Sequence, residues 1–137
     1  LRDAGLRVYN RLGVIYHESN KIYNQGHIAF NWSSQLDIPA RFFEGMAQKK
    51  LMVTNRLPDI EKLRFKENID YVGFSNKEEA IDKIKYFLVH KDEMDKIAQA
   101  GYEKVREHTW ENRTQQLLDI ISNKIGRDWY ENKGSGK

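Results

Sequence analysis

The 137-residue sequence contains no cysteine, two prolines and no apolar run of the length, about 20 residues, that crosses a bilayer. The absence of cysteine excludes disulfides, thiolate chemistry and Cys-ligated zinc. The sequence also lacks a signal-peptide apolar core, a P-loop, a GxGxxG motif and a Ser-His-Asp arrangement. Lys and Arg number 23 against 20 Asp and Glu, and they are interleaved, so no basic stripe suits nucleic acid. We therefore expect a soluble cytoplasmic domain without nucleic-acid partners or transmembrane segments.

What is present indicates one globular domain. Hydrophobic residues make up 39% of the chain and aromatic residues 12%, which is enough for a core, and the length fits a single domain or a large piece of one. The sequence begins without Met and ends on the low-complexity run Gly134–Lys137. We expect a fragment of a longer protein, with a domain at residues 1–125 and a frayed or non-native tail at 126–137.

The first half alternates apolar runs with helical patterns. We predict strands at 6–9, 27–32, 51–54 and 69–74, and a strand end or loop at 12–16. A helix is predicted at 18–25, ended by Gly26, and another begins near Pro39 with Phe43, Met46 and Ala47 as its buried face. Strands that alternate with helices predict an open, parallel, Rossmann-like α/β sheet.

The second half is predicted to be helical. The run from Ser75 to Glu78 matches the S-x-x-E capping box and opens a helix that ends near His90. A second helix is predicted from Asp92 to Glu107. A third begins at Thr109, its N-cap, and is expected to bury the apolar residues Trp110, Leu117, Leu118, Ile121 and Ile125. We expect the helical second half as a whole to cover one face of the sheet.

The loop after the second strand is the strongest candidate for a ligand site. It carries Ser33, Ser34 and Asp37 and enters a helix whose free N–H groups favour an anion. Arg41 in the first turn supplies a fork of donors for phosphate, and Glu44 one turn later can accept hydrogen bonds from a diol. Together these groups suit a nucleotide diphosphate with its ribose. The alternative is that the serines and Asp37 only cap the helix while Arg41 pairs with Asp37.

Other conspicuous residues admit plainer interpretations. Trp32 follows a strand and either stacks a base or sugar or packs in the core, and Trp129-Tyr130 is a candidate docking patch. The histidines lack the spacing of metal ligands, so we predict no metal site at His17, His27, His90 or His108.

Several motifs in order resemble group 1 glycosyltransferases, and among these the subgroup of spore-maturation CgeB-like proteins. The motifs are I-Y-N-Q at 22–25, I-A-F-N at 28–31, R-F-F-E-G-M-A at 41–47 and L-M-V-T-N at 51–55. The resemblance continues through the helix at 77–90 to G-Y-E-K-V at 101–105 and H-T-W-E-N-R at 108–113. It covers residues 9–121, most of the chain.

The resemblance implies the GT-B architecture, in which two Rossmann-like domains flank a cleft. The chain corresponds to the later part of the C-terminal domain, which binds the nucleotide-sugar donor. In the family, the glutamate equivalent to Glu44 contacts the donor ribose. The loop from Ser34 to Arg41 approaches the diphosphate, and the segment from Gly13 to Tyr16 lies against the base.

The resemblance also assigns Ser33, Asp37, Phe42 and Asn55 to the donor site. It implies that no metal or cofactor is required, because helix dipoles and basic side chains stabilise the leaving diphosphate. The nucleotide sugar is a substrate. The resemblance implies that the acceptor (a glycan, a protein or a small molecule) is bound by an N-terminal domain that this chain does not include.

The sequence departs from the family at one position. Many relatives carry an E-x7-E arrangement, but the residue eight places before Glu44 is Leu36, and the nearest acid is Asp37. This departure weakens the expectation of a sugar-contacting carboxylate. The family's upstream Arg/Lys phosphate pair would precede Leu1, and the acceptor domain is not in this chain, so we expect that the chain alone is not a competent catalyst. A non-catalytic α/β interaction module with a degenerate donor site is the alternative function.

Overall fold

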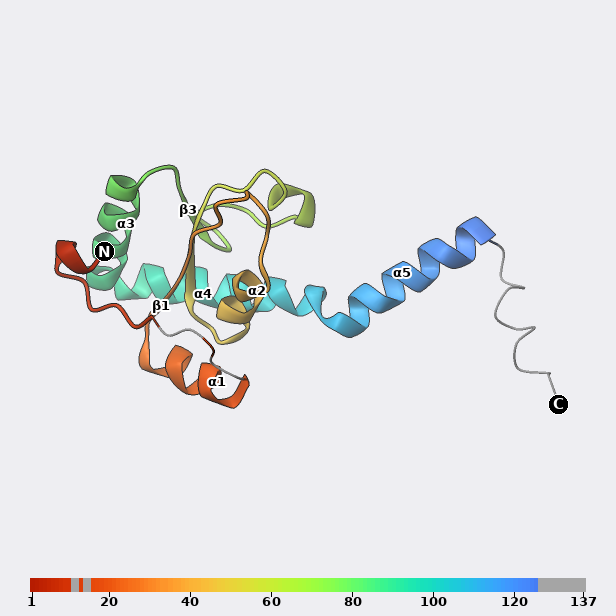
Figure 1. The fold of residues 1–137 in the computed structure, drawn as a ribbon, viewed down its shortest axis with the longest axis horizontal. Helices are drawn as coiled ribbons and strands as arrows, with labels where there is room; N and C mark the ends of the chain where they lie inside the picture. Colours follow the sequence, from red (N-terminus) through yellow and green to blue (C-terminus); the bar gives the residue numbers. More distant parts are fainter. Residues whose placement is uncertain (11–12, 14–15, 126–137) are drawn as a thin grey trace. The chain divides into compact units, whose positions relative to one another are not determined.

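The computed structural model describes residues 1–10, 13 and 16–125, and the tail expected at 126–137 lies outside the described residues. The chain forms two compact units, the main unit Leu1–Arg106 and the C-terminal unit Glu107–Lys137. The elements of the main unit are η1 (Arg2–Ala4), α1 (Tyr16–Gln25), β1 (Ile28–Asn31), α2 (Ala40–Ala47), β2 (Leu51–Asn55), η2 (Glu61–Leu63), β3 (Val72–Phe74), α3 (Lys77–Val89) and α4 (Lys91–Val105) (Figure 1).

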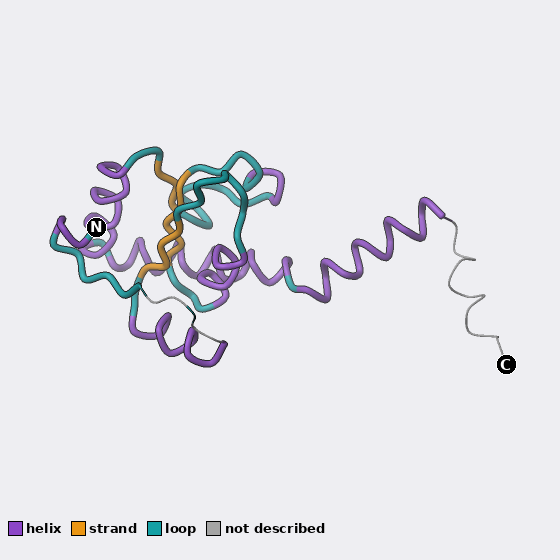
Figure 2. Tube along the Cα trace, viewed as in Figure 1, coloured by secondary structure: helices purple, strands orange, loops and turns teal. Residues whose placement is uncertain are grey.

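The three strands form one parallel sheet in the order β1-β2-β3 (Figure 2). Phe30 pairs with Val53, which pairs with Val72, so the carboxyl ends of all three strands lie at one edge. The predicted α/β parallel sheet is confirmed. β1 is one residue shorter at each end than the apolar run predicted at 27–32. β3 is shorter than the run predicted at 69–74, because residues 69 and 70 belong to a turn.

Helices cover both faces of the sheet, and α2 and α3 lie on opposite sides of the strands (Figure 1). The cluster on the α2 side is formed by Ala29, Phe42, Met46, Met52, Leu57, Ile60, Phe65, Tyr71 and Val105. The cluster on the α3 side is formed by Leu51, Val53, Val72, Phe74, Ala80, Ile84, Phe87, Met94 and Ala98. α4 contributes to both clusters, with Met94 and Ala98 on the α3 side and Val105 on the α2 side.

The buried face of α2 is shifted by one position toward the N-terminus from the predicted face. Phe42, Gly45 and Met46 are buried, whereas Phe43 is half-buried and Ala47 is exposed. The reason is the close approach of α2 to the sheet at Gly45. A Cβ atom there would lie 2.5 Å from Met52 Cε and 2.6 Å from Ala29 Cβ, so only glycine fits this contact.

The strand predicted at 6–9 is wrong. Residues 6–10 have no regular secondary structure, and Leu6 N donates to Leu1 O at 3.4 Å instead of to a strand. No neighbouring strand among the described residues pairs with this run, and an unpaired strand leaves its backbone groups unsatisfied. Within the segment predicted as a strand end or loop at 12–16, residues 12, 14 and 15 lie outside the described residues, and Tyr16 begins α1.

The predicted capping box is shifted by one residue. Asn76, not Ser75, is the N-cap of α3, and its side chain accepts a hydrogen bond from Glu79 N at 2.8 Å. The Glu79 carboxylate reaches back to Ser75 N at 2.7 Å, so Glu79 takes the role predicted for Glu78. The two reciprocal hydrogen bonds of a capping box are therefore present, one residue later in the sequence than predicted.

η3 (Arg106–His108) begins at the last residue of the main unit and ends in the C-terminal unit, which also contains α5 (Trp110–Ile125). Thr109 caps α5 as predicted, because its Oγ1 accepts from Asn112 N at 3.2 Å. The predicted burial is wrong for three residues: Trp110 is 85% exposed, and Leu117 and Leu118 are also exposed. Ile121 is half-buried, and the expectation for Ile125 falls outside the described side chains.

The exposure of α5 has a simple cause. Within the described part of its unit, α5 has no second long helix or strand to cover an apolar stripe. Helical periodicity predicts which residues share a face, but burial also needs a partner surface. In the described ranges no helix is long and apolar enough to cross a membrane.

Candidate functional site

The carboxyl ends of β1 and β2 carry buried polar side chains that bond to one another. Asn31 Nδ2 donates to Thr54 Oγ1 at 2.8 Å. Asn55 clamps the loop after β1 with two hydrogen bonds: its Oδ1 accepts from Ser33 N at 2.8 Å and its Nδ2 donates to Ser33 O at 3.0 Å. The end of β2 therefore fixes the backbone of the loop that leads to α2.

Arg41 ties the first turn of α2 to the same edge. Its Nε donates to Asn31 Oδ1, and one terminal nitrogen donates to Trp32 O at 3.1 Å. Asp37 accepts a hydrogen bond from Ser33 Oγ rather than pairing with Arg41. The guanidinium is thus anchored through one side, and Arg41 is exposed at the surface of the edge.

The N-terminus of α2 suits an anion. Pro39 is the N-cap, it makes no side-chain capping bond, and the first turn of the helix contains no acidic residue. Uncapped N–H groups carry the positive end of the helix dipole, and the Arg41 cation stands in the same turn. The combination supplies backbone and side-chain donors without a competing carboxylate in that turn.

Glu44 lies one turn beyond Arg41 and is exposed. Phe42, which the resemblance placed in the donor site, is instead fully buried. Its ring makes edge-to-face contacts with Phe65 at 5.2 Å and Tyr71 at 5.9 Å between centroids. Phe42 therefore anchors α2 to the core, while Arg41 and Glu44 present their polar groups at the surface.

The other predicted site residues are spread around this edge. Ser34 is exposed in the loop, whereas Ser33 and Asn55 are buried and shape the backbone. Tyr16 is the first residue of α1. Trp32 is 52% exposed and stacks on Phe74 with 5.8 Å between ring centroids, so it is both packed and accessible.

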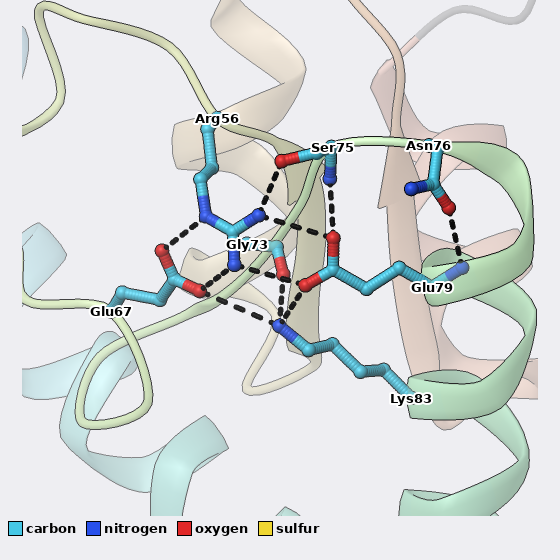
Figure 3. A network of polar contacts seen from close by, with 7 residues as sticks. All are labelled: Arg56, Glu67, Gly73, Ser75, Asn76, Glu79 and Lys83. Carbon is cyan, nitrogen blue, oxygen red and sulfur yellow. Dashed lines mark hydrogen bonds and ion pairs between the residues drawn. The ribbon is translucent and has the colours of Figure 1, made fainter.

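A charged network beside β3 was not predicted from the sequence (Figure 3). Arg56, the residue after β2, donates to both oxygens of Glu67 at 3.0 and 2.8 Å and to both oxygens of Glu79 at 3.1 and 2.9 Å. Lys83 Nζ lies 2.8 Å from Glu79 Oε1 and donates to Gly73 O at 2.6 Å. The network joins the β2–β3 connection to the first two turns of α3.

Two features show how closely this network is fitted. A Cβ atom on Gly73 would lie 2.7 Å from the Glu67 carboxylate, so the glycine makes room for that group against β3. Arg56 and Lys83 lower the pKa of Glu79 to about 2, with a further contribution from the Ser75 N–H. The one signal in the sequence was the spacing of Glu79 and Lys83, four residues apart on a helix.

The comparison with protein families concerns nearly the whole chain. A family model described as "Glycosyl transferase-like" matches residues 3–119. The chain belongs to this family. The matched range includes the whole parallel sheet and the edge that carries Arg41 and Glu44. Neither the search of curated proteins nor the search of solved structures found a match.

The glycosyl transferase-like chain has a fold consistent with a Rossmann-like domain, and the family supports a function in glycosyl transfer. Within the described ranges, no group of three or more His, Cys, Asp or Glu residues is arranged to hold a metal ion. The groups gathered here are an uncapped helix N-terminus, a guanidinium and a carboxylate, which are chemical types that can bind a polyanion and a diol.

Proposed function

We propose that this chain is the nucleotide-sugar donor-binding part of a group 1, GT-B glycosyltransferase of the CgeB-like subgroup. The acceptor domain then belongs to another part of the full-length protein. The observation that carries the proposal is the placement of Arg41 and Glu44, both exposed and one turn apart, on α2 at the carboxyl edge of a parallel sheet. Ligands of open α/β sheets bind outside this edge.

In this proposal Arg41 and the N–H groups at the start of α2 bind the diphosphate, and Glu44 accepts hydrogen bonds from the ribose. Ser34 borders the diphosphate. Ser33, Asp37 and Asn55 act through the loop, because their hydrogen bonds fix its backbone.

The same groups suit the transfer step. An acceptor hydroxyl forms a bond to the anomeric carbon as the bond from that carbon to the diphosphate breaks. The electron pair remains on the diphosphate, and the proton of the hydroxyl is released to water. The negative charge that develops there lies toward the positive end of α2 and the Arg41 guanidinium. Such stabilisation requires neither a metal nor a cofactor, and the nucleotide sugar is consumed as substrate.

Donor binding is tested by titrating the chain with UDP, GDP and ADP, followed by NMR or calorimetry. We expect saturable binding of one nucleotide, weakened by about 1–3 kcal/mol in Glu44→Ala, because a charge-assisted hydrogen bond is lost. Glu78→Ala is the matched control, since Glu78 is an exposed helical glutamate on α3. An affinity in Glu44→Ala equal to that of the control refutes the role of Glu44.

One observation favours a second function, a non-catalytic interaction module that keeps the fold. Leu36, at the position where many relatives carry an acid, is 54% exposed, and the adjacent Asp37 is engaged by Ser33. If none of the three nucleotides binds, either to the chain or to the full-length protein, this second function replaces the first.

A further inference from the structure

Side chains of α1 contact α2 and its C-cap residue. Asn20 Oδ1 accepts a hydrogen bond from Gln48 Nε2 at 2.9 Å. One turn further along α1, Tyr23 Cε1 lies 3.8 Å from the position that a Cβ atom on Gly45 would occupy. Residues 20 and 23 share a face of α1, so these two contacts show that this face is directed toward α2.

The α2 positions in these contacts belong to a longer stripe. Arg41, Glu44, Gly45 and Gln48 occupy positions i, i+3, i+4 and i+7, which form one continuous face of a helix. The α1 face that contains Tyr23 therefore borders the stripe that presents Arg41 and Glu44. Tyr23 is half-buried, with its ring packed against the core cluster on the α2 side.

The electrostatics agree with this placement. Burial raises the pKa of Tyr23, the Glu44 carboxylate raises the pKa further, and Arg41 acts in the opposite direction. The phenol therefore keeps its proton at neutral pH, and it lies within the electrostatic influence of both side chains. A phenolic hydroxyl both donates and accepts, so it complements a carboxylate, which only accepts.

We propose that Tyr23 is a specificity-determining residue of the donor site, whose hydroxyl pairs with the Glu44 carboxylate to recognise the vicinal diol of ribose. This inference rests on the proposed function. The 2′-hydroxyl donates a hydrogen bond to the Glu44 carboxylate and accepts one from the Tyr23 hydroxyl. A nucleotide that lacks the 2′-hydroxyl leaves these groups without partners, and such sites discriminate strongly against the deoxy ligand.

The test compares ribonucleotide and 2′-deoxyribonucleotide affinities in three proteins: the wild-type chain, Tyr23→Phe and Tyr102→Phe. The probes are UDP, GDP and ADP and their 2′-deoxy forms. Tyr102 is the matched control, because it is also half-buried and its ring lies under Lys49 Nζ at 4.5 Å from the centroid. The Phe variants keep the packed ring, and equal thermal midpoints establish that each is folded.

We expect the wild-type preference for the ribonucleotide to fall about five- to tenfold in Tyr23→Phe and to stay unchanged in Tyr102→Phe. A purely structural role of Tyr23 would weaken both ligands equally and leave their ratio intact, which overturns the inference. If the wild type binds a nucleotide and Glu44→Ala weakens it while Tyr23→Phe keeps the ratio, only the role of Tyr23 fails. If no nucleotide binds, the proposed function fails and the role of Tyr23 fails with it.

Discussion

The charged network around Arg56 leads to a quantitative prediction for Glu79→Gln. Glutamine keeps an oxygen that can accept from Ser75 N, so the capping geometry is preserved while the negative charge is lost. What the substitution removes is the attraction of Arg56 and Lys83, which lowers the pKa of Glu79 to about 2. We expect the main unit to be less stable, because two cations then share the single carboxylate of Glu67.

The size of the effect follows from the pKa. A fall from 4.5 to about 2 corresponds to an upper bound of about 3 kcal/mol in the free energy of unfolding. The side chains of Glu79 and Arg56 are 27% and 43% exposed, so solvent screening reduces the expected loss to about 1–2 kcal/mol. Glu78→Gln changes the neighbouring exposed residue and is expected to cost less than about 0.5 kcal/mol.

The pH dependence separates charge from packing. Because the pKa of Glu79 is depressed in the folded state, its stabilisation is complete above about pH 4.5 and is lost as the pH falls toward about 2. The stability difference between the wild type and Glu79→Gln should therefore be full at pH 7 and close near pH 2. Added salt should also reduce it.

The assay is urea unfolding followed by the fluorescence of Trp32, the tryptophan of the main unit. Replacing Trp110 and Trp129 by Phe in every variant removes the other two tryptophans, so the signal reports that unit. Equal unfolding midpoints for Glu79→Gln and Glu78→Gln at pH 7 would refute the stabilising role of the network. A difference that persists unchanged at pH 2 would assign the effect to packing instead.

Three further substitutions test the packing described above. Gly45→Ala should destabilise the main unit by about 1–3 kcal/mol in urea unfolding, because its Cβ has no room against the sheet, whereas Gly26→Ala meets only ordinary contacts at 3.8 Å and should be milder. Asn55→Ala should lower the free energy of unfolding by about 1–3 kcal/mol, since the Ser33 N–H and C=O both lose their hydrogen bonds to the Asn55 side chain, and unchanged unfolding would contradict the clamp. Trp110→Ser should change the free energy of unfolding of the main unit by less than about 0.5 kcal/mol, because the Trp110 side chain is exposed.

The elements that the sequence predicts well are those whose signal is local. β1, β2 and β3 follow from apolar runs between helical segments, and α2 begins where Pro39 marks a helix start. The run at 6–9 has the same local pattern, but within the described residues no strand pairs with it. Strand formation depends on a partner that the run itself does not encode.

The candidate site was predictable in part for a similar reason. Arg41 and Glu44 follow from helical spacing at a strand-to-helix junction, and the structure leaves both exposed there. The burial of Phe42 was missed because the close approach at Gly45 turns α2 by one residue. The pairing of Arg56 with Glu79 spans 23 residues, so sequence spacing gives no sign of it.

The position of α4 in both core clusters has a consequence for the order of folding. Met94 and Ala98 complete the cluster on one side of the sheet, and Val105 completes the cluster on the other. During synthesis the three strands leave the ribosome well before this helix does, and until it arrives both apolar layers stay partly open to water. We therefore expect the main unit to complete its core only when α4 has been synthesised. A truncation before residue 91 should yield an aggregation-prone chain rather than a smaller stable domain.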